Sequence, residues 1–190
     1  MLLVQKAMTV NIAKALETPG WCEPDELQWL AERAQEHETI VEVGSWLGRS
    51  TRALGDNAKG TVIAVDTWWG PRDRLVWVSD FNIRSWDAYQ MFLLNLDDLI
   101  AAGKVSPMPC SSVVAASAFK RESVDMVFLD GSHDELDVKL DISCWLRVLK
   151  PGGLLCGHDY GGTWVGVKAA VDAMLPDFKL ATGSIWYAYV

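Results

Sequence analysis

Apolar residues along this chain gather in short β-branched runs that alternate with longer stretches whose apolar positions recur at helical spacing. Each short run is bounded by glycine, proline or an acid, which is typical of a buried strand. The pattern predicts strands at Thr39–Gly44, Gly60–Asp66, Lys104–Met108, Ser123–Asp130, Leu154–Gly157 and Ser184–Val190. It predicts helices at Pro24–Glu38, Arg49–Ala58, Ala88–Ala102, Glu135–Leu149 and Gly166–Met174, with Lys150-Pro151-Gly152-Gly153 stopping the fourth of them.

Strands and helices that alternate with short connections indicate an α/β fold, with a parallel, doubly wound sheet and helices on both faces. Pro24–Glu38 precedes this alternation, and we expect it to cover the sheet edge or the mouth of a ligand site. The chain length fits one domain over residues 1–190. Within it we expect a leading helical extension at 1–38 and a Rossmann-like core at 39–190.

The composition narrows the classes of partner. Half of the 190 residues are hydrophobic, so a sizeable core is expected, and the net charge of −8 argues against a nucleic-acid surface. The apolar run Met1–Val4 is too short for a signal-peptide core and no segment reaches membrane-spanning length, which favours a cytoplasmic protein without a membrane partner. The widely spaced cysteines are expected to be reduced apolar fillers: Cys22, Cys110, Cys144 and Cys156.

The most informative segment is Val41-Glu42-Val43-Gly44-Ser45-Trp46-Leu47-Gly48-Arg49-Ser50-Thr51. It combines an apolar strand that carries Glu42, a tight turn between Gly44 and Gly48, and a helix start near Ser50. Glycines let the backbone approach a ligand, and the first N–H groups of a helix bind a carboxylate or a phosphate. The spacing Gly-x-x-x-Gly differs from the dinucleotide fingerprint Gly-x-Gly-x-x-Gly, which disfavours a nicotinamide-dependent oxidoreductase.

This segment resembles motif I of the class I S-adenosylmethionine-dependent methyltransferases, and its acid and serine resemble the catechol O-methyltransferase type. The resemblance covers about residues 39–175 and implies a seven-stranded, mostly parallel sheet with an antiparallel last strand. It also implies S-adenosyl-L-methionine as cofactor, with the Ser50 hydroxyl on its carboxylate. The cofactor-binding residues expected on this basis are Glu42, Gly44, Ser45, Trp46, Gly48, Ser50, Asp66, Thr67, Trp68, Ser111, Ser112 and Asp130.

Three of these residues have a more specific expected role. Asp66 closes the second strand and can accept hydrogen bonds from both ribose hydroxyls of a nucleoside, although it could equally cap the next turn. The resemblance places Ser111 at the adenine edge, a role that is compatible with a helix N-cap. Trp68 is expected to pack on the adenine face.

Polar residues also end the fourth and fifth predicted strands, in Asp130-Gly131-Ser132-His133-Asp134 and in Gly157-His158-Asp159-Tyr160. Ligands of an open α/β sheet bind beyond the carboxyl ends of its strands, so these two clusters are expected to share a site. Asp130, His158 and Asp159 offer oxygen and imidazole ligands suited to a divalent cation.

These positions resemble the metal-dependent O-methyltransferases, including the macrocin O-methyltransferase. The resemblance implies that Asp130, His158 and Asp159 hold Mg²⁺ or another divalent cation, and that His133 stands where the catechol enzyme has its lysine base. His158 is a softer ligand than the usual carboxylate, which leaves the identity and presence of the metal open. Asp134-Glu135-Leu136 lacks the tyrosine often found there, so the acceptor pocket is not defined.

The expected reaction is methyl transfer to a hydroxyl of a small-molecule acceptor, with Asp130 and His133 as catalytic residues. A cation on Asp130 and Asp159 would orient the hydroxyl and lower its pKa. A histidine at position 133 could then take the proton near neutral pH. The identity of the acceptor stays open, as does the formation of a homo-oligomer.

Two other functions stay open. An iron-dependent, hydroxylase-like relative would use His133, His158 and an acid as two-histidine-one-carboxylate ligands. A non-catalytic cofactor-binding scaffold would use the segment Trp68–Trp86 as an interface, because this segment is rich in aromatic and basic residues: Trp68, Trp69, Trp77, Trp86, Arg72, Arg74 and Arg84. The same segment could instead be a packed loop, or a lid over a flat or anionic acceptor.

Overall fold

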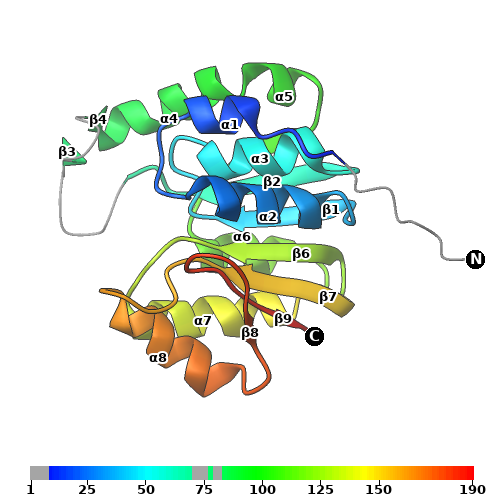
Figure 1. The fold of residues 1–190 in the computed structure, drawn as a ribbon, viewed down its shortest axis with the longest axis vertical. Coiled ribbons are helices and arrows are strands. Elements are labelled where there is room, and N and C mark those ends of the chain that lie inside the picture. The colour runs from blue at the N-terminus through cyan, green and yellow to red at the C-terminus, as the bar shows by residue number, and fades with distance from the viewer. Residues whose placement is uncertain (1–8, 70–76, 79–82) are drawn as a thin grey trace, which may run out of the picture.

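A computed structural model describes residues 9–69, 77–78 and 83–190, with side chains described for 9–69 and 87–190 (Figure 1). Its strands are β1 (Thr39–Val43), β2 (Thr61–Asp66), β3 (Trp77–Val78), β4 (Ile83–Arg84), β5 (Val105–Pro109), β6 (Val124–Leu129), β7 (Leu149–Gly157), β8 (Lys179–Leu180) and β9 (Trp186–Tyr189). Its helices are α1 (Ala13–Glu17), α2 (Pro24–Ala34), α3 (Arg49–Asn57), α4 (Ser85–Asn95), α5 (Asp97–Ala101), α6 (Ser112–Ala118), α7 (Glu135–Leu146) and α8 (Val165–Met174).

Seven of the described strands form one sheet in the order β5-β2-β1-β6-β7-β9-β8, and β3 pairs with β4 in a separate ribbon. The first five strands of that order are parallel, whereas β9 runs antiparallel to both β7 and β8. The predicted Rossmann-like α/β sheet with an antiparallel last strand is therefore confirmed. Because five strands are parallel, their carboxyl ends lie along one edge of the sheet, where ligands of such sheets bind.

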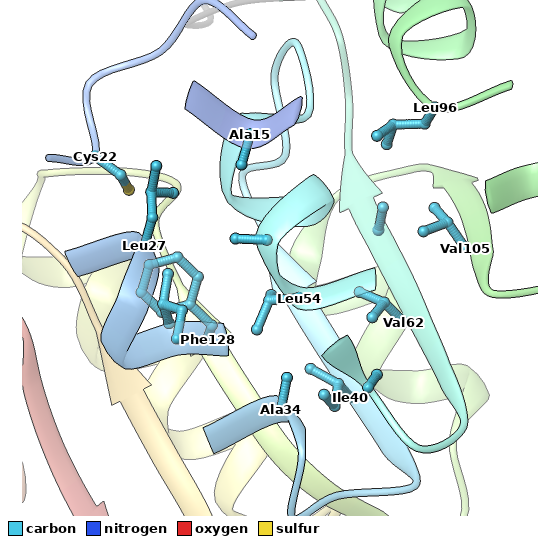
Figure 2. Close-up of a cluster of buried hydrophobic side chains, with 14 of the residues drawn as sticks. Ala15, Cys22, Leu27, Ala34, Ile40, Leu54, Val62, Leu96, Val105 and Phe128 are labelled. Carbon is cyan, nitrogen blue, oxygen red and sulfur yellow. The ribbon is translucent and has the colours of Figure 1, made fainter. Parts of the chain in front are cut away.

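The strands are apolar because both faces of the sheet are covered (Figure 1). Neighbouring residues of β1 illustrate the alternation, since Ile40 packs with α1 to α5 and Val41 packs with α6 to α8. Figure 2 shows the first of these two clusters, in which Leu27 of α2 and Leu54 of α3 approach Phe128 of β6 and Ile40. The core thus holds the strand ends in fixed relative positions.

Several boundaries differ from the prediction. The helix expected at Ala88–Ala102 is two helices, α4 and α5, which meet at Leu96 (φ −121°). Its apolar periodicity continues across the break because both helices pack on the same cluster. The Lys150-Pro151-Gly152-Gly153 segment does not separate α7 from the next strand but lies within β7, where Gly152 has a φ of +79° and the pairing with β6 shifts register.

The leading helix α2 begins with Pro24 and a reciprocal capping box between Glu23 and Glu26, and it ends at Ala34, before the predicted end. It lies beside α3 over one face of the sheet (Figure 1). Its first turn reaches the carboxyl ends of the strands, where the Glu26 side chain contacts His158. The helix therefore borders the region in which a ligand site was expected.

The hypotheses about the segment Trp68–Trp86 mostly lie outside the described residues. Residues 70–76 and 79–82, with Arg72 and Arg74, are not described, and neither are the side chains of Trp77, Arg84 and Trp86. The lid, the packed loop and the interface thus stay predictions. Among the helices of the described residues, none has the length and apolar character required to cross a membrane.

Candidate active site

Gly44 joins the loop after β1 to the end of β6. Its φ is +91°, and a Cβ atom at this position would lie 2.0 Å from the Asp130 carbonyl oxygen. The next residue of the loop, Ser45, is buried, and its carbonyl oxygen accepts a hydrogen bond from the Gly48 N–H at 2.7 Å. Glycine is thus required at position 44 so that the two predicted motifs can touch, and the expected approach to a ligand stays a prediction.

Gly48 is the N-cap of α3 and has a φ of +91°. The next side chain, Arg49, points back to the segment before α2: its Nε donates to the Cys22 carbonyl oxygen at 2.9 Å and its Nη1 to the Thr18 carbonyl oxygen at 2.8 Å. The same Nη1 also reaches the carbonyl oxygens of Ala15 and Leu16. The start of α3 is therefore tied to the leading segment.

Asp66 holds the same loop from the end of β2. Its Oδ2 accepts a hydrogen bond from the Trp46 N–H at 2.8 Å, and its Oδ1 accepts one from the Trp68 N–H at 2.7 Å. Burial raises the pKa of Asp66, although these and other backbone hydrogen bonds oppose the shift. Both carboxylate oxygens of Asp66 thus hold the backbone at Trp46 and at Trp68. Ribose hydroxyls, if they bind Asp66 as predicted, would have to donate to oxygens that already accept these hydrogen bonds.

Trp68 is buried, not open to the strand ends. Its ring packs against Tyr89 and Phe92 at centroid distances of 4.6 and 4.9 Å, and its Nε1 donates to the Trp46 carbonyl oxygen at 2.7 Å. Trp46 in turn stacks on Trp21 at 4.2 Å. The indole of Trp68 therefore supports the loop, and its contact with an adenine ring stays a prediction. The neighbouring Thr67 is exposed, and its hydroxyl oxygen faces the Trp69 N–H at 3.4 Å.

Glu42 is fully buried beneath this loop and accepts a hydrogen bond from the Thr51 hydroxyl. Burial raises its pKa to about 7, against the lowering effect of the hydroxyls of Ser50, Thr51 and Ser45. Ser50 is itself buried, with its hydroxyl directed at this acid. The Ser50 hydroxyl thus lies close to a buried acid, and its predicted contact with the cofactor's carboxylate stays untested.

The two serines after β5 differ in their surroundings. Ser111 is exposed at the N-cap position of α6, but its side chain makes no capping hydrogen bond. The Ser112 hydroxyl accepts a hydrogen bond from Trp145 Nε1 at 2.8 Å. The same hydroxyl also hydrogen-bonds Asp141, whose pKa is raised to about 6 because burial outweighs the lowering effect of the bond from Ser112. Ser111 is thus the more available of the two for a ligand.

The predicted cluster at the ends of β6 and β7 is brought together. His158 Nδ1 lies 3.5 Å from Asp130 Oδ1 and 3.4 Å from Asp159 Oδ1. The other Asp159 oxygen, Oδ2, lies 2.8 Å from His133 Nε2. The His133 ring stacks on Trp164 at 3.8 Å with an interplanar angle of 15°. A single carboxylate thus contacts both histidines of the cluster.

The charges of this cluster shift its pKa values strongly. Burial lowers the pKa of His158, but Asp130, Asp159 and Glu26 outweigh burial and raise this pKa well above its ordinary value. Burial raises the pKa of Asp130, and His158 opposes the shift. For Asp159, burial is outweighed by His133 and His158, so its pKa lies well below the ordinary value. Strong shifts of this kind in a cleft mark a candidate functional site.

Two residues of the site were missed by sequence reasoning. Glu26 Oε2 lies 2.9 Å from His158 Nε2, and its Oε1 accepts hydrogen bonds from the Ser184 N–H and hydroxyl at 2.8 and 3.1 Å. Burial raises the pKa of Glu26, but the hydrogen bonds from His158, Ser184 and Glu23 lower it to about 2. The second missed residue is Cys22, whose Sγ lies within 4.8 Å of ligand atoms of Asp130 and His158. The capping pattern at Glu23–Glu26 could predict only a helix start.

A small pocket lies at these strand ends. It is bordered by the cluster, by the turn after β6 and by α7, α8 and β9: Leu129, Asp130, Gly131, Ser132, His133, Val138, Asp141, His158, Asp159, Val167 and Trp186. The pocket thus contains every predicted catalytic and metal-binding residue. The glycine loop borders it through the contact between Gly44 and Asp130.

Comparison with known proteins gives one family match and many structural ones. A family model described as a methyltransferase domain matches residues 41–160. No curated protein matches the chain at a significant level.

Among solved structures, an O-methyltransferase from Bacillus cereus in complex with SAH has a TM-score of 0.64 at 14% identity, covering 93% of this chain and 86% of that one. A SAM-dependent O-methyltransferase from Thermotoga maritima has a TM-score of 0.62 at 15% identity, covering 94% and 70%. A precorrin 8w decarboxylase from Methanobacterium thermoautotrophicum has a TM-score of 0.63 at 18% identity, covering 92% and 95%. At these identities the likeness concerns the fold alone.

Proposed function

The chain belongs to the methyltransferase family whose model spans residues 41–160, and we propose that it transfers the methyl group of S-adenosylmethionine to a hydroxyl of a small molecule. It is a methyltransferase with the class I, Rossmann-like fold. The observation that carries the proposal is the contact between Gly44 and the Asp130 backbone, which puts the motif I loop against the carboxylate and histidine cluster. A cofactor bound on one side of that contact would lie beside an acceptor bound on the other.

His133 is the base in this proposal. Its Nε2 lies 2.8 Å from Asp159 Oδ2, so the tautomer that donates from Nε2 leaves Nδ1 free to accept a hydroxyl proton. Asp159 fixes this tautomer, and the stacked ring of Trp164 restricts the imidazole to one plane. Methyl transfer from a sulfonium is an in-line displacement that needs a deprotonated and oriented acceptor oxygen. In this proposal His133 is the base that removes the proton, and Asp159 and Trp164 orient its imidazole ring.

The cluster also fits a divalent cation, which stays a proposal. His158 Nδ1 is 3.4 and 3.5 Å from two carboxylate oxygens, longer than a usual N–H···O hydrogen bond but suited to atoms that share a metal. Asp130, His158 and Asp159 would hold the cation, which when bound would orient the acceptor hydroxyl and lower its pKa. Without a cation, the positive charge of His158 itself balances the surrounding carboxylates.

The iron-dependent alternative is less well supported by the geometry. A two-histidine-one-carboxylate centre needs His133 and His158 to present nitrogens to one point. Instead, Nε2 of His133 faces Asp159 and Nε2 of His158 faces Glu26. Among the described residues, the group of side chains close enough to hold a metal contains only one of these histidines.

The first test is calorimetric titration of the protein with S-adenosylhomocysteine, with NAD as control. We expect S-adenosylhomocysteine to bind and NAD not to bind. Asp66→Ala should weaken the binding more than tenfold, because the Trp46 and Trp68 turns lose their common acceptor. The matched control is Asp177→Ala, at an exposed aspartate. Absence of S-adenosylhomocysteine binding by the unaltered protein would refute the proposed cofactor.

The second test addresses the acceptor. Transfer of a labelled methyl group from S-adenosylmethionine would be measured on phenols, sugars and hydroxy acids, and on matched amines and thiols. We expect labelling of a hydroxyl compound only. Cofactor binding without transfer to any acceptor would favour the scaffold, and labelling of an amine or a thiol would overturn the hydroxyl specificity.

A further inference from the structure

Cys22 lies at the candidate site although nothing in its sequence context marks it. It follows α1 and precedes α2, and its side chain is only 5% exposed. Its Sγ and one ligand atom each of Asp130 and His158 all lie within 4.8 Å of one another. Figure 2 shows Cys22 at the margin of the apolar cluster, beyond Leu27. A thiol, a carboxylate and an imidazole thus converge from three separate segments of the chain.

The spacing around His158 suits ligands that share a cation. Its side chain is 8% exposed, and Nδ1 has carboxylate oxygens at 3.4 and 3.5 Å, outside the usual hydrogen-bond range of about 2.7–3.2 Å. Ligands at about 2.0–2.1 Å from a tetrahedral metal lie about 3.3–3.4 Å apart. For octahedral Mg²⁺ at about the same radius, neighbouring ligands lie only about 3.0 Å apart, and all are preferably oxygen.

Both sides of this arrangement are held by other residues. His158 Nε2 lies 2.9 Å from Glu26 Oε2, so the buried carboxylate orients the ring with Nδ1 toward the cluster. Metal-binding histidines commonly donate their other ring N–H to a carboxylate in this way. On the other side, Arg49 Nε fixes the Cys22 carbonyl oxygen at 2.9 Å. Cys22 and His158 are therefore positioned independently of one another.

We propose that Cys22, Asp130 and His158 bind a zinc-type cation, with Cys22 as a thiolate ligand and Glu26 as the carboxylate that orients His158. A thiolate and an imidazole select a borderline-soft cation over Mg²⁺. The thiol releases its proton to solvent when the metal–sulfur bond forms. This set has Cys22 in the place of Asp159, which was named as a ligand above, because the described side chains close enough to share a metal are those of Cys22, Asp130 and His158. A tetrahedral cation on these three ligands has its fourth position open, and the use of that position by the acceptor oxygen rests on the proposed function.

The test is titration of the metal-free, full-length protein with Co²⁺, which takes the place of Zn²⁺ and is followed by absorption. We expect one Co²⁺ per chain and the near-ultraviolet charge-transfer band of a thiolate–cobalt bond. Cys22→Ser should lose the band and bind Co²⁺ and Zn²⁺ at least tenfold more weakly. Cys110→Ser and Cys144→Ser, at cysteines outside the cluster, should keep both.

Three results would overturn the inference: a wild-type protein without the thiolate band, a band that persists in Cys22→Ser, or displacement of Co²⁺ by equimolar Mg²⁺. If Cys22→Ser fails to fold, the wild-type spectrum and the variants Cys110→Ser, Cys144→Ser and Cys156→Ala still decide, because a band that survives in all three leaves Cys22 as the thiolate ligand. Titration of the same samples with S-adenosylhomocysteine keeps this inference separate from the proposed function. Cofactor binding without a thiolate band would refute only the metal site, and a band without cofactor binding would refute only the proposed cofactor and methyl transfer.

Discussion

Glu26 and His158 are 132 residues apart in the sequence, and their side chains meet at 2.9 Å in a position where both are buried. Glu26 also accepts hydrogen bonds from the Glu23 N–H and from Ser184, so four donors share one carboxylate. This contact connects the leading helix to the ends of β7 and β9. It makes the segment before the Rossmann-like core a part of the candidate site.

Glu26→Gln should lower the free energy of unfolding by about 3 kcal/mol, because the amide leaves His158 without its buried counter-charge and turns an NH₂ group toward donors. Urea denaturation followed by tryptophan fluorescence measures this change. Glu32→Gln on the same helix is the control, and at this less buried position a change within about 0.5 kcal/mol is expected. An equally small effect of Glu26→Gln would show that the contact contributes little to stability.

Gly44→Ala should be strongly destabilising for two reasons, a steric clash and an unfavourable backbone conformation. A control substitution at Gly161 measures the second reason alone. The added Cβ would meet the Asp130 carbonyl oxygen at 2.0 Å, and the φ of +91° is unfavourable for alanine. Gly161 has a φ of +95° with nothing within 4 Å of its Cβ position, so Gly161→Ala reports the backbone cost alone, about 1–2 kcal/mol.

We expect Gly44→Ala to exceed that control by at least about 2 kcal/mol, or to prevent folding, because backbone atoms cannot move aside cheaply. Thermal unfolding of the two variants makes the comparison. Equal losses of stability would mean that β1 and β6 relax apart and that the contact between the motif I loop and the cluster is not rigid.

Glu42 gives a pH dependence of stability whose sign can be worked out. Its pKa is about 7 in the folded protein and about 4.5 in the unfolded chain, so between these values the folded state binds more protons. Stability from this group is therefore present below pH 4.5 and falls as the pH rises to about 7, by about 3 kcal/mol in total. Neutral Glu42→Gln escapes this loss, so its stability relative to the wild type should rise over that range.

Urea denaturation of both proteins at pH 4, 6 and 8 checks this prediction. The free energy of unfolding of Glu42→Gln minus that of the wild type should have its lowest value at pH 4 and its highest value at pH 8. Asp177→Asn, which changes an exposed carboxylate, should show no such trend. A difference that does not depend on pH would mean that Glu42 has the same pKa in the folded protein as in the unfolded chain.

The sequence was informative wherever burial imposes a simple pattern. Strands covered on both faces are β-branched runs, and the carboxyl ends of parallel strands share an edge, so the proximity of Asp130, His158 and Asp159 could be predicted. Cys22 and Glu26 could not, because their place depends on how α2 packs beside α3, which helical periodicity leaves undetermined. The burial of Trp68 depends likewise on α4, which supplies Tyr89 and Phe92.

The relation between His133 and Asp159 leads to a prediction on turnover. His133 Nε2 lies 2.8 Å from Asp159 Oδ2, and its ring is stacked on Trp164, so these two residues orient the imidazole and neither belongs to the motif I loop. His133→Gln should therefore lower kcat about 10²–10⁴-fold, the usual contribution of a general base, and leave the Kd for S-adenosylhomocysteine unchanged. Single-turnover methyl transfer and calorimetry measure the two quantities on the same preparation.

His37→Gln, at a histidine before β1 and away from the cluster, should change neither kcat nor the Kd for S-adenosylhomocysteine. If His133→Gln weakens S-adenosylhomocysteine binding as much as Asp66→Ala does, then His133 belongs to the cofactor site and another group must take the proton.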